Sequence, residues 1–261
     1  MTSPTRAPKT ASQEGKLAER VYKLQLALVR DINDTHIFVQ QALPLLRKAQ
    51  KQYATSNDGD DRRYIVPSHK RSKFANRTDE ELREIYGRYI ATELYNNLLA
   101  TIVSKCESFI FDVLRLVLRA YPKKLTMNIR GLELKRTVDM DTILSATDIE
   151  QLHCALIEQR LHSITYAKPA EYLQYLRSIA HINTDDKAFG DYVELKATRD
   201  NIVHNGGIAN ATYRLKAGTK ARAKEGQRLV MNAAYFDQCV ATIKRVSGII
   251  KRDIEAHFPT S

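Results

Sequence analysis

Apolar residues recur every three or four positions along most of this chain, which is the spacing of an α-helix with one buried face. The first such stretch runs from about residue 16 to residue 53 and includes Leu17, Val21 and Leu24. Pro44 lies inside it and is expected to kink or divide the helix, because proline cannot donate the backbone hydrogen bond. The pattern therefore predicts an N-terminal helical segment.

A second long helix is predicted from Thr78 or Asp79, either of which can cap it, to Arg119. About 40 helical residues would span roughly 60 Å, which is long for a globular protein, so we expect a break near Gly87. Tyr121-Pro122 ends the helix, since the residue before proline disfavours helical geometry. The apolar positions advance by threes and fours with one adjacent pair: Leu94, Leu98, Ile102, Cys106, Phe109, Val113, Leu116 and Val117.

Further helices are predicted over residues 148–163, from Pro169 onward, from Asp185 or Asp186 to His204, and over 232–257. Asn205-Gly206-Gly207 should end the third of these, because Asn and Gly tolerate the left-handed conformation after a helix. Residues 123–145 give no clear pattern. A short strand pair near Tyr213 and Leu229-Val230 is the only strand signal.

These elements predict an all-α fold, a helical bundle with an N-terminal helical extension. We divide the chain into a disordered tail at 1–14, a helical extension with a basic loop at 15–78, and a helical domain at 79–261.

Net charge and cysteine spacing narrow the range of partners and cellular settings expected for the protein. The 261 residues carry a formal net charge of +11, which favours a polyanionic partner, nucleic acid first, although many basic proteins bind none. The three cysteines are widely spaced and form no CxxC pair, so we predict no metal site, no cofactor and a cytoplasmic setting. No apolar run approaches the roughly 20 residues of a membrane span, and the polar N-terminus lacks a signal-peptide core.

Motifs for common enzyme classes are missing from the sequence: it contains no GxxxxGK[ST], GxGxxG, GxSxG or HExxH. Among seven histidines, His204 stands out because it ends a predicted helix directly before Asn205-Gly206-Gly207. The carbonyl end of a helix favours a cation there.

Arg199 and His204 suggest a chemistry that needs no metal. In RNA the 2′-hydroxyl is an internal nucleophile, so a protein need only move protons, as histidine can, and stabilise phosphate charge, as arginine can. Five positions apart on a helix, the two side chains point about 140° apart with roughly 7.5 Å of rise between them. One helix frames only half a pocket, and a symmetric homodimer would complete it.

The segment Arg199-Asp-Asn-Ile-Val-His204-Asn-Gly-Gly-Ile resembles the signature of the HEPN superfamily: Arg, a polar residue, a short spacer and His. The stretch from Glu107 to Tyr121-Pro122 is similar to the first long core helix of those proteins. The resemblance extends over residues 80 to 255, but only the first patch is specific.

The resemblance implies a HEPN-like bundle, usually a homodimer, acting as a metal-independent endoribonuclease that leaves 2′,3′-cyclic phosphate ends, in antiviral defence or a toxin system. Arg199 and His204 match catalytic positions and Asp200 the polar helper. Asn205 either orients His204 or only caps the helix, and Glu107 is expected to hold Arg199 by a buried ion pair. An alternative is a catalytically inactive HEPN-like module that binds RNA or a protein, and a helical scaffold without nucleic acid is a third reading.

A basic loop over residues 214–228 follows the motif closely in sequence and is expected either to grip RNA phosphates or to be only a solvated loop. The expected partners are thus RNA, a second copy of the chain and a regulatory or antitoxin protein, with no membrane. The candidate RNA-binding residues are Arg214, Lys216, Lys220, Arg222, Lys224 and Arg228.

Overall fold

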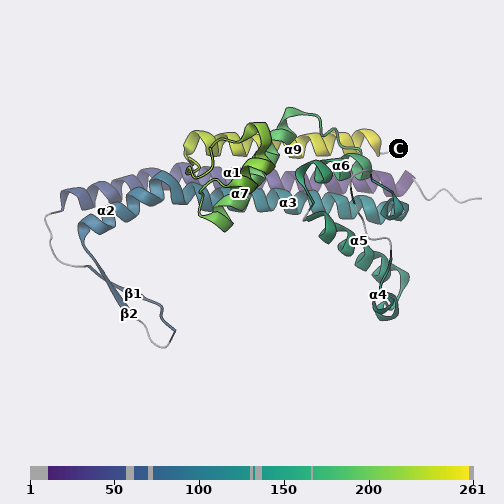
Figure 1. The fold of residues 1–261 in the computed structure, drawn as a ribbon, viewed down its shortest axis with the longest axis horizontal. Coiled ribbons are helices and arrows are strands. Elements are labelled where there is room, and N and C mark those ends of the chain that lie inside the picture. Colours follow the sequence, from purple (N-terminus) through teal and green to yellow (C-terminus); the bar gives the residue numbers. More distant parts are fainter. Residues whose placement is uncertain are drawn as a thin grey trace, which may run out of the picture.

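The protein is mostly helical and elongated in the computed structural model (Figure 1). The structure describes residues 11–56, 62–69, 73–129, 132, 137–165 and 167–258, with side chains from residue 16 onward. The predicted tail at 1–14 lies largely outside these residues, although helix already begins at Ala11. The elements are α1 (Ala11–Thr55), β1 (Arg62–Val66), β2 (Lys73–Arg77), α2 (Asp79–Arg88), a π-helical turn (Tyr89–Glu93), α3 (Leu94–Ala120), a 3-10 turn (Pro122–Thr126), α4 (Met140–Ser145), α5 (Ile149–Thr165), α6 (Pro169–Ala180), α7 (Lys187–Asn205), α8 (Ala211–Ala217), a 3-10 turn (Gly218–Lys220) and α9 (Ala233–His257).

The helix α1 is longer than expected. Its 45 residues pass through Pro44 without a division, so the predicted division at this proline is wrong. An α-helix of this length spans about 68 Å. In Figure 1, α1, α3 and α9 run alongside one another, and α1 packs against both partners.

One hydrophobic core joins the N-terminal helix to the rest of the chain. Val21 and Ile32 of α1, Leu99 and Ile110 of α3, and Ile243 of α9 are all fully buried in it. The residues expected to form an extension therefore share their core with the predicted helical domain.

The boundary between α2 and α3 lies near the predicted break at Gly87, but the helix continues through it. Thr78 and Glu81 form a reciprocal capping box, as expected of this start signal. The helix then widens at Tyr89–Glu93, where π-helical geometry inserts an extra residue per turn just after Gly87. A π-helical turn therefore stands in place of the predicted break, within one continuous helical segment.

A β-hairpin corrects the all-α prediction. β1 and β2 pair antiparallel, with Arg62 opposite Arg77 and Val66 opposite Lys73. Figure 1 shows the hairpin projecting from the end of the molecule where α1 meets α2. The other predicted strand pair is wrong: Tyr213 lies in α8, and only an isolated bridge joins Ile208 to Arg228.

The helix α7 carries the candidate motif and packs against α3, α8 and α9. It starts where predicted, with Asp186 accepting a hydrogen bond from the backbone N–H of Ala188, and ends at Gly206, which adopts φ +58°. The prediction of α9 is also confirmed, with Asn232 as its N-cap. The motif is therefore held on a helix that is anchored on three sides.

Candidate functional site

Glu107 of α3 lies at the centre of the candidate site. It is buried, with 9% of its surface exposed, and it accepts hydrogen bonds from two cations one turn apart on α7. Lys196 Nζ contacts one carboxylate oxygen and Arg199 Nη2 the other. The predicted ion pair between Glu107 and Arg199 is therefore present, and Lys196 is a further member that the sequence reading missed.

Asp200 extends this set of charges towards α8. Its carboxylate lies 3.0 Å from Nη1 of Arg199 and 3.0 Å from Nζ of Lys216. We call the five side chains Lys196, Glu107, Arg199, Asp200 and Lys216 the Glu107 network. It ties α3, α7 and α8 together through alternating positive and negative groups.

Partial burial affects Lys196 and Arg199 in different ways: it lowers the pKa of the lysine, and it leaves one nitrogen of the arginine without a hydrogen-bond partner. Burial lowers the pKa of Lys196, and the Asp200 carboxylate partly opposes that effect. The Arg199 side chain retains 20% of its exposure, and its buried Nε has no hydrogen-bond partner in the described structure. A buried donor without an acceptor costs about 1–3 kcal/mol, so this guanidinium is held in place but incompletely satisfied.

His204 lies in the last turn of the same helix and is exposed. No hydrogen bond to its ring is found within the described residues. The neighbouring Asn205 donates its amide N–H to the carbonyl oxygen of Ile208, as does Asn201 from 2.9 Å. Asn205 therefore holds the turn after the helix, which corresponds to the capping role of the two roles considered for it.

Apolar side chains beside the motif are also exposed. Val203 retains 55% of its surface, and Leu215 on the adjoining α8 retains 85%. Each of these apolar side chains could be covered by contact with another molecule.

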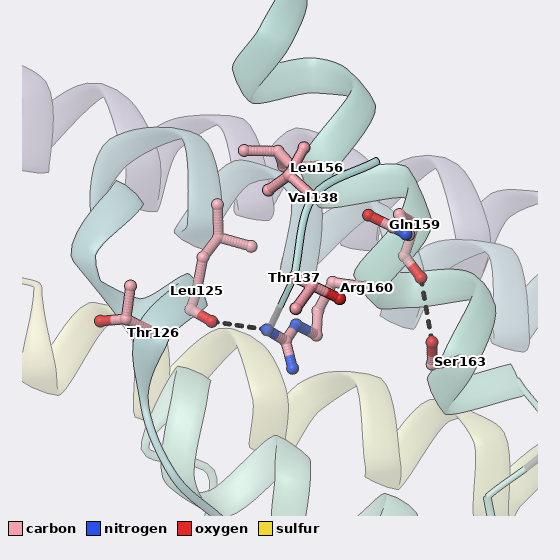
Figure 2. A pocket seen from close by; sticks show the side chains of 8 residues that line it. All are labelled: Leu125, Thr126, Thr137, Val138, Leu156, Gln159, Arg160 and Ser163. Carbon is pink, nitrogen blue, oxygen red and sulfur yellow. Dashed lines mark hydrogen bonds between the residues drawn. The ribbon is translucent and has the colours of Figure 1, made fainter. Parts of the chain in front are cut away.

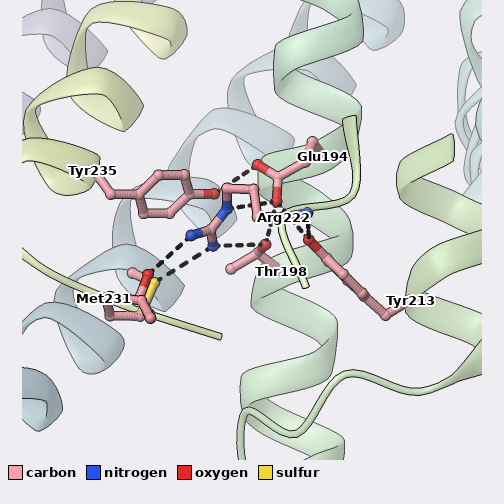
Figure 3. Close-up of polar contacts among 7 residues, drawn as sticks. Glu194, Thr198, Tyr213, Arg222, Met231 and Tyr235 are labelled. Atoms are coloured by element: carbon pink, nitrogen blue, oxygen red, sulfur yellow. Dashed lines mark hydrogen bonds and ion pairs between the residues drawn. The ribbon is translucent and has the colours of Figure 1, made fainter. Parts of the chain in front are cut away.

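A second polar network missed by the sequence reading surrounds Glu194 (Figure 3). This buried carboxylate accepts hydrogen bonds from Thr198 at 2.7 Å, Tyr213 at 3.0 Å, Tyr235 at 2.7 Å and Arg222 Nε at 3.0 Å. The Arg222 guanidinium also stacks over the Tyr235 ring, 3.4 Å from its centroid. The only sequence signal was an acidic residue between apolar neighbours in a predicted helix.

Arg222 is therefore placed differently from the expectation. It was expected to grip RNA, but its guanidinium is occupied by Glu194, by the Thr198 hydroxyl and by the carbonyl of Val230. Its positive charge compensates an interior carboxylate, so we remove it from the candidate RNA-binding set.

The other basic residues after the motif divide into paired and unpaired ones. Lys216 pairs with Asp200, Lys220 with Asp191, and Arg228 donates to the carbonyl oxygen of Gly206 from 3.2 Å. Arg214 and Lys224 are exposed, and their side chains have no partner within the described part of the chain. The first part of the expected loop is helical, because residues 211–217 form α8.

Neither of two cavities in the described structure touches the motif. One, of about 110 Å³, lies between α5 and the segments before α4, where Arg160 donates to the carbonyl oxygen of Leu125 at 2.8 Å (Figure 2). The other, of about 380 Å³, lies along the end of α1.

Metal binding and membrane insertion find no support among the described residues. They contain no group of three or more His, Cys, Asp and Glu side chains placed to hold a metal ion. None of their helices combines the length and the apolar character of a membrane span.

A scan against protein-family models and searches of curated proteins and of solved structures find no match for this chain.

Proposed function

We propose that the chain is a metal-independent endoribonuclease whose site is built from Arg199 and His204, with Asp200 as the polar helper. The observation that carries the proposal is the placement of Arg199: it is clamped by carboxylates on both sides yet retains 20% of its side-chain exposure. A positioned guanidinium can donate to the non-bridging oxygens of a phosphodiester as charge develops there.

His204 supplies the proton transfer in this proposal. Its ring is exposed at the end of α7 and is not committed to any described hydrogen bond. An imidazole changes charge near neutral pH, so it can take the proton of a ribose 2′-hydroxyl or give one to the leaving 5′-oxygen. The product ends would be a 2′,3′-cyclic phosphate and a 5′-hydroxyl.

A second copy of the chain would complete the site. Arg199 and His204 diverge around α7, so a single helix cannot direct both at one phosphate. The exposed Val203 and Leu215 lie beside them and offer apolar contact to a partner. A two-fold axis passing near His204 would bring two arginines and two histidines into one cleft.

The alternative is a catalytically inactive HEPN-like module that binds RNA or a protein. The Glu107 network favours it in one respect, because two carboxylates already compensate the charge of Arg199. Antiviral defence, a toxin system and a regulatory or antitoxin partner remain proposals that follow from the resemblance.

End-labelled RNA incubated with the protein in excess chelator tests the proposal. We expect cleavage with cyclic-phosphate ends, lost in Arg199→Ala and in His204→Ala while far-UV circular dichroism stays unchanged. Arg30→Ala and His153→Ala are matched controls outside the site and should cleave normally. Intact RNA with the parent protein, or activity in the two site variants equal to that of the parent, would refute the assignment.

The dimer is tested separately by sedimentation. A monomeric parent at working concentration would contradict the shared site. Val203→Asp and Leu215→Asp are expected to shift a dimer towards monomer and to lower cleavage together, because charge on an apolar contact disfavours association.

A further inference from the structure

The β-hairpin is the one part of the described chain that projects away from the helices (Figure 1). It is far from α7 in the fold and plays no part in the proposed cleavage site. Its base is fixed: Arg62 Nε donates to the buried Asp79 carboxylate at 2.7 Å, and its guanidinium lies 5.2 Å from the centroid of the Tyr53 ring. The hairpin is thus anchored to α1 and α2 and presents its outer part to solvent.

The strand register places Arg63, Ile65, Phe74 and Asn76 on one face, because directly opposed residues share a side of the sheet. This face is exposed: Ile65 retains 71% of its surface and Phe74 54%. The Arg63 guanidinium covers the Phe74 ring, 3.6 Å from its centroid. The face therefore offers a cationic group backed by an aromatic ring.

The charge of this region is positive and weakly compensated. Residues 62–77 contain six Lys and Arg and no Asp or Glu. Within the described residues, Arg63, Lys73 and Arg77 have no carboxylate partner. The hairpin therefore complements a polyanion.

The neighbouring helices add to this charge. The hollow of about 380 Å³ along the end of α1 is lined by Arg47, Lys48 and Lys51 and by no acidic residue. The acidic start of α2 is largely occupied, since Asp79 pairs with Arg62, Glu80 with Arg83, and Glu81 closes the capping box.

We propose that this hairpin face binds single-stranded RNA. An unpaired base would stack on the Arg63 and Phe74 pair, and the charge of the Arg63 guanidinium would also attract a flanking phosphate. Lys73 and Arg77, on the opposite face of the two strands, add to the positive charge that attracts the nucleic-acid backbone. Stacking requires a base that is not already stacked in a duplex, which favours single-stranded over double-stranded nucleic acid. A guanidinium placed over an aromatic ring also fits a planar base better than the interior of a lipid bilayer.

The inference goes beyond the proposed cleavage, because it needs neither Arg199 nor His204. Binding of a fluorescein-labelled unstructured RNA is measured by anisotropy in the His204→Ala background, where cleavage cannot interfere. Phe74→Ala and Arg63→Ala are expected to weaken binding by about fivefold to 150-fold, the range for loss of one stacked base. Arg63→Ala should also reduce the slope of log affinity against log salt by about 0.7, the value for one phosphate contact on a single strand.

Phe38→Ala and Arg30→Ala are the matched controls. Phe38 is 57% exposed on α1, close to the 54% of Phe74, so general loss of exposed aromatic surface would affect both alike. Unchanged RNA affinity in both hairpin variants, equal losses in the controls, or binding to anionic phosphatidylserine vesicles but not to RNA would each overturn the inference. If the hairpin variants weaken RNA binding but the parent protein does not cleave RNA, the proposed nuclease is refuted and the hairpin site stands. If the parent cleaves RNA but the hairpin variants bind it as well as the parent does, the hairpin site is refuted and the nuclease stands.

Discussion

Replacing Glu107 by glutamine removes the charge that joins α3 to α7 while keeping the size of the side chain. Glu107 accepts hydrogen bonds from Lys196 and Arg199, and a hydrogen bond to a charged group contributes about 1.5–3 kcal/mol. Glutamine keeps one oxygen acceptor, but its amide N–H groups face the other cation. One of the two hydrogen bonds is thus lost, and the other is weakened because its acceptor no longer carries a charge.

Exposure limits the size of the effect. The side chains of Lys196 and Arg199 retain 24% and 20% of their exposure, so water stabilises part of the uncompensated charge. Fully buried pairs lose about 3–5 kcal/mol when one partner is removed, and we expect about 2 kcal/mol here. That corresponds to a melting temperature lower by about 4–8 °C for a protein of this size.

Urea unfolding followed by far-UV circular dichroism measures the loss, provided that the slope against urea is unchanged. Glu150→Gln is the control, because Glu150 is exposed on α5 and should change stability by less than about 0.5 kcal/mol. Combining Glu107→Gln with Lys196→Met should cost less than the sum of the two single changes. A loss in Glu107→Gln no larger than in the control, or strictly additive losses, would show that the Glu107 network does not stabilise the fold.

Three further changes test other elements. Gly206→Ala forces φ +58° on a residue with a Cβ and should destabilise the protein by about 1 kcal/mol, seen as a lower melting temperature, whereas Gly206→Asn should cost less. Asn232→Ala removes the side-chain oxygen that accepts a backbone N–H at 2.9 Å and should cost about 1 kcal/mol in urea unfolding, whereas Asn232→Asp keeps the cap. Burial, Lys124 and His257 lower the pKa of His181, so the unfolded state binds more protons below about pH 6.5 and stability should fall on acidification from pH 7 to pH 5. His181→Asn, which tolerates the φ of +57°, should flatten that dependence, and parallel pH profiles for the two proteins would contradict this reasoning.

Helix positions were readable from the sequence because helical periodicity and capping are local. Thr78, Asp186 and Asn232 each lie at a predicted helix start, and each side chain accepts the expected backbone N–H. Gly206 ends α7 for an equally local reason, the left-handed conformation that glycine tolerates. Such signals depend on residues within four positions of one another.

The hairpin was not readable in this way. Its strands are five residues each and mostly exposed, so neither shows the alternation of buried and exposed positions that marks a half-buried strand. Their pairing is stabilised by cross-strand contacts such as Arg63 on Phe74 and by the anchor between Arg62 and Asp79. Basic composition alone suggested only a loop.

The sequence by itself determined a basic, mostly helical chain and the local order Arg199, Asp200, His204 near the end of one helix. Only the tertiary structure decided which charges meet. Glu107 lies 92 residues before Arg199, and Glu194 takes Arg222 from a segment 28 residues further on. A cation expected to face a phosphate was thereby assigned to an interior carboxylate, because burial makes an unpaired charge far more costly inside the protein than at its surface.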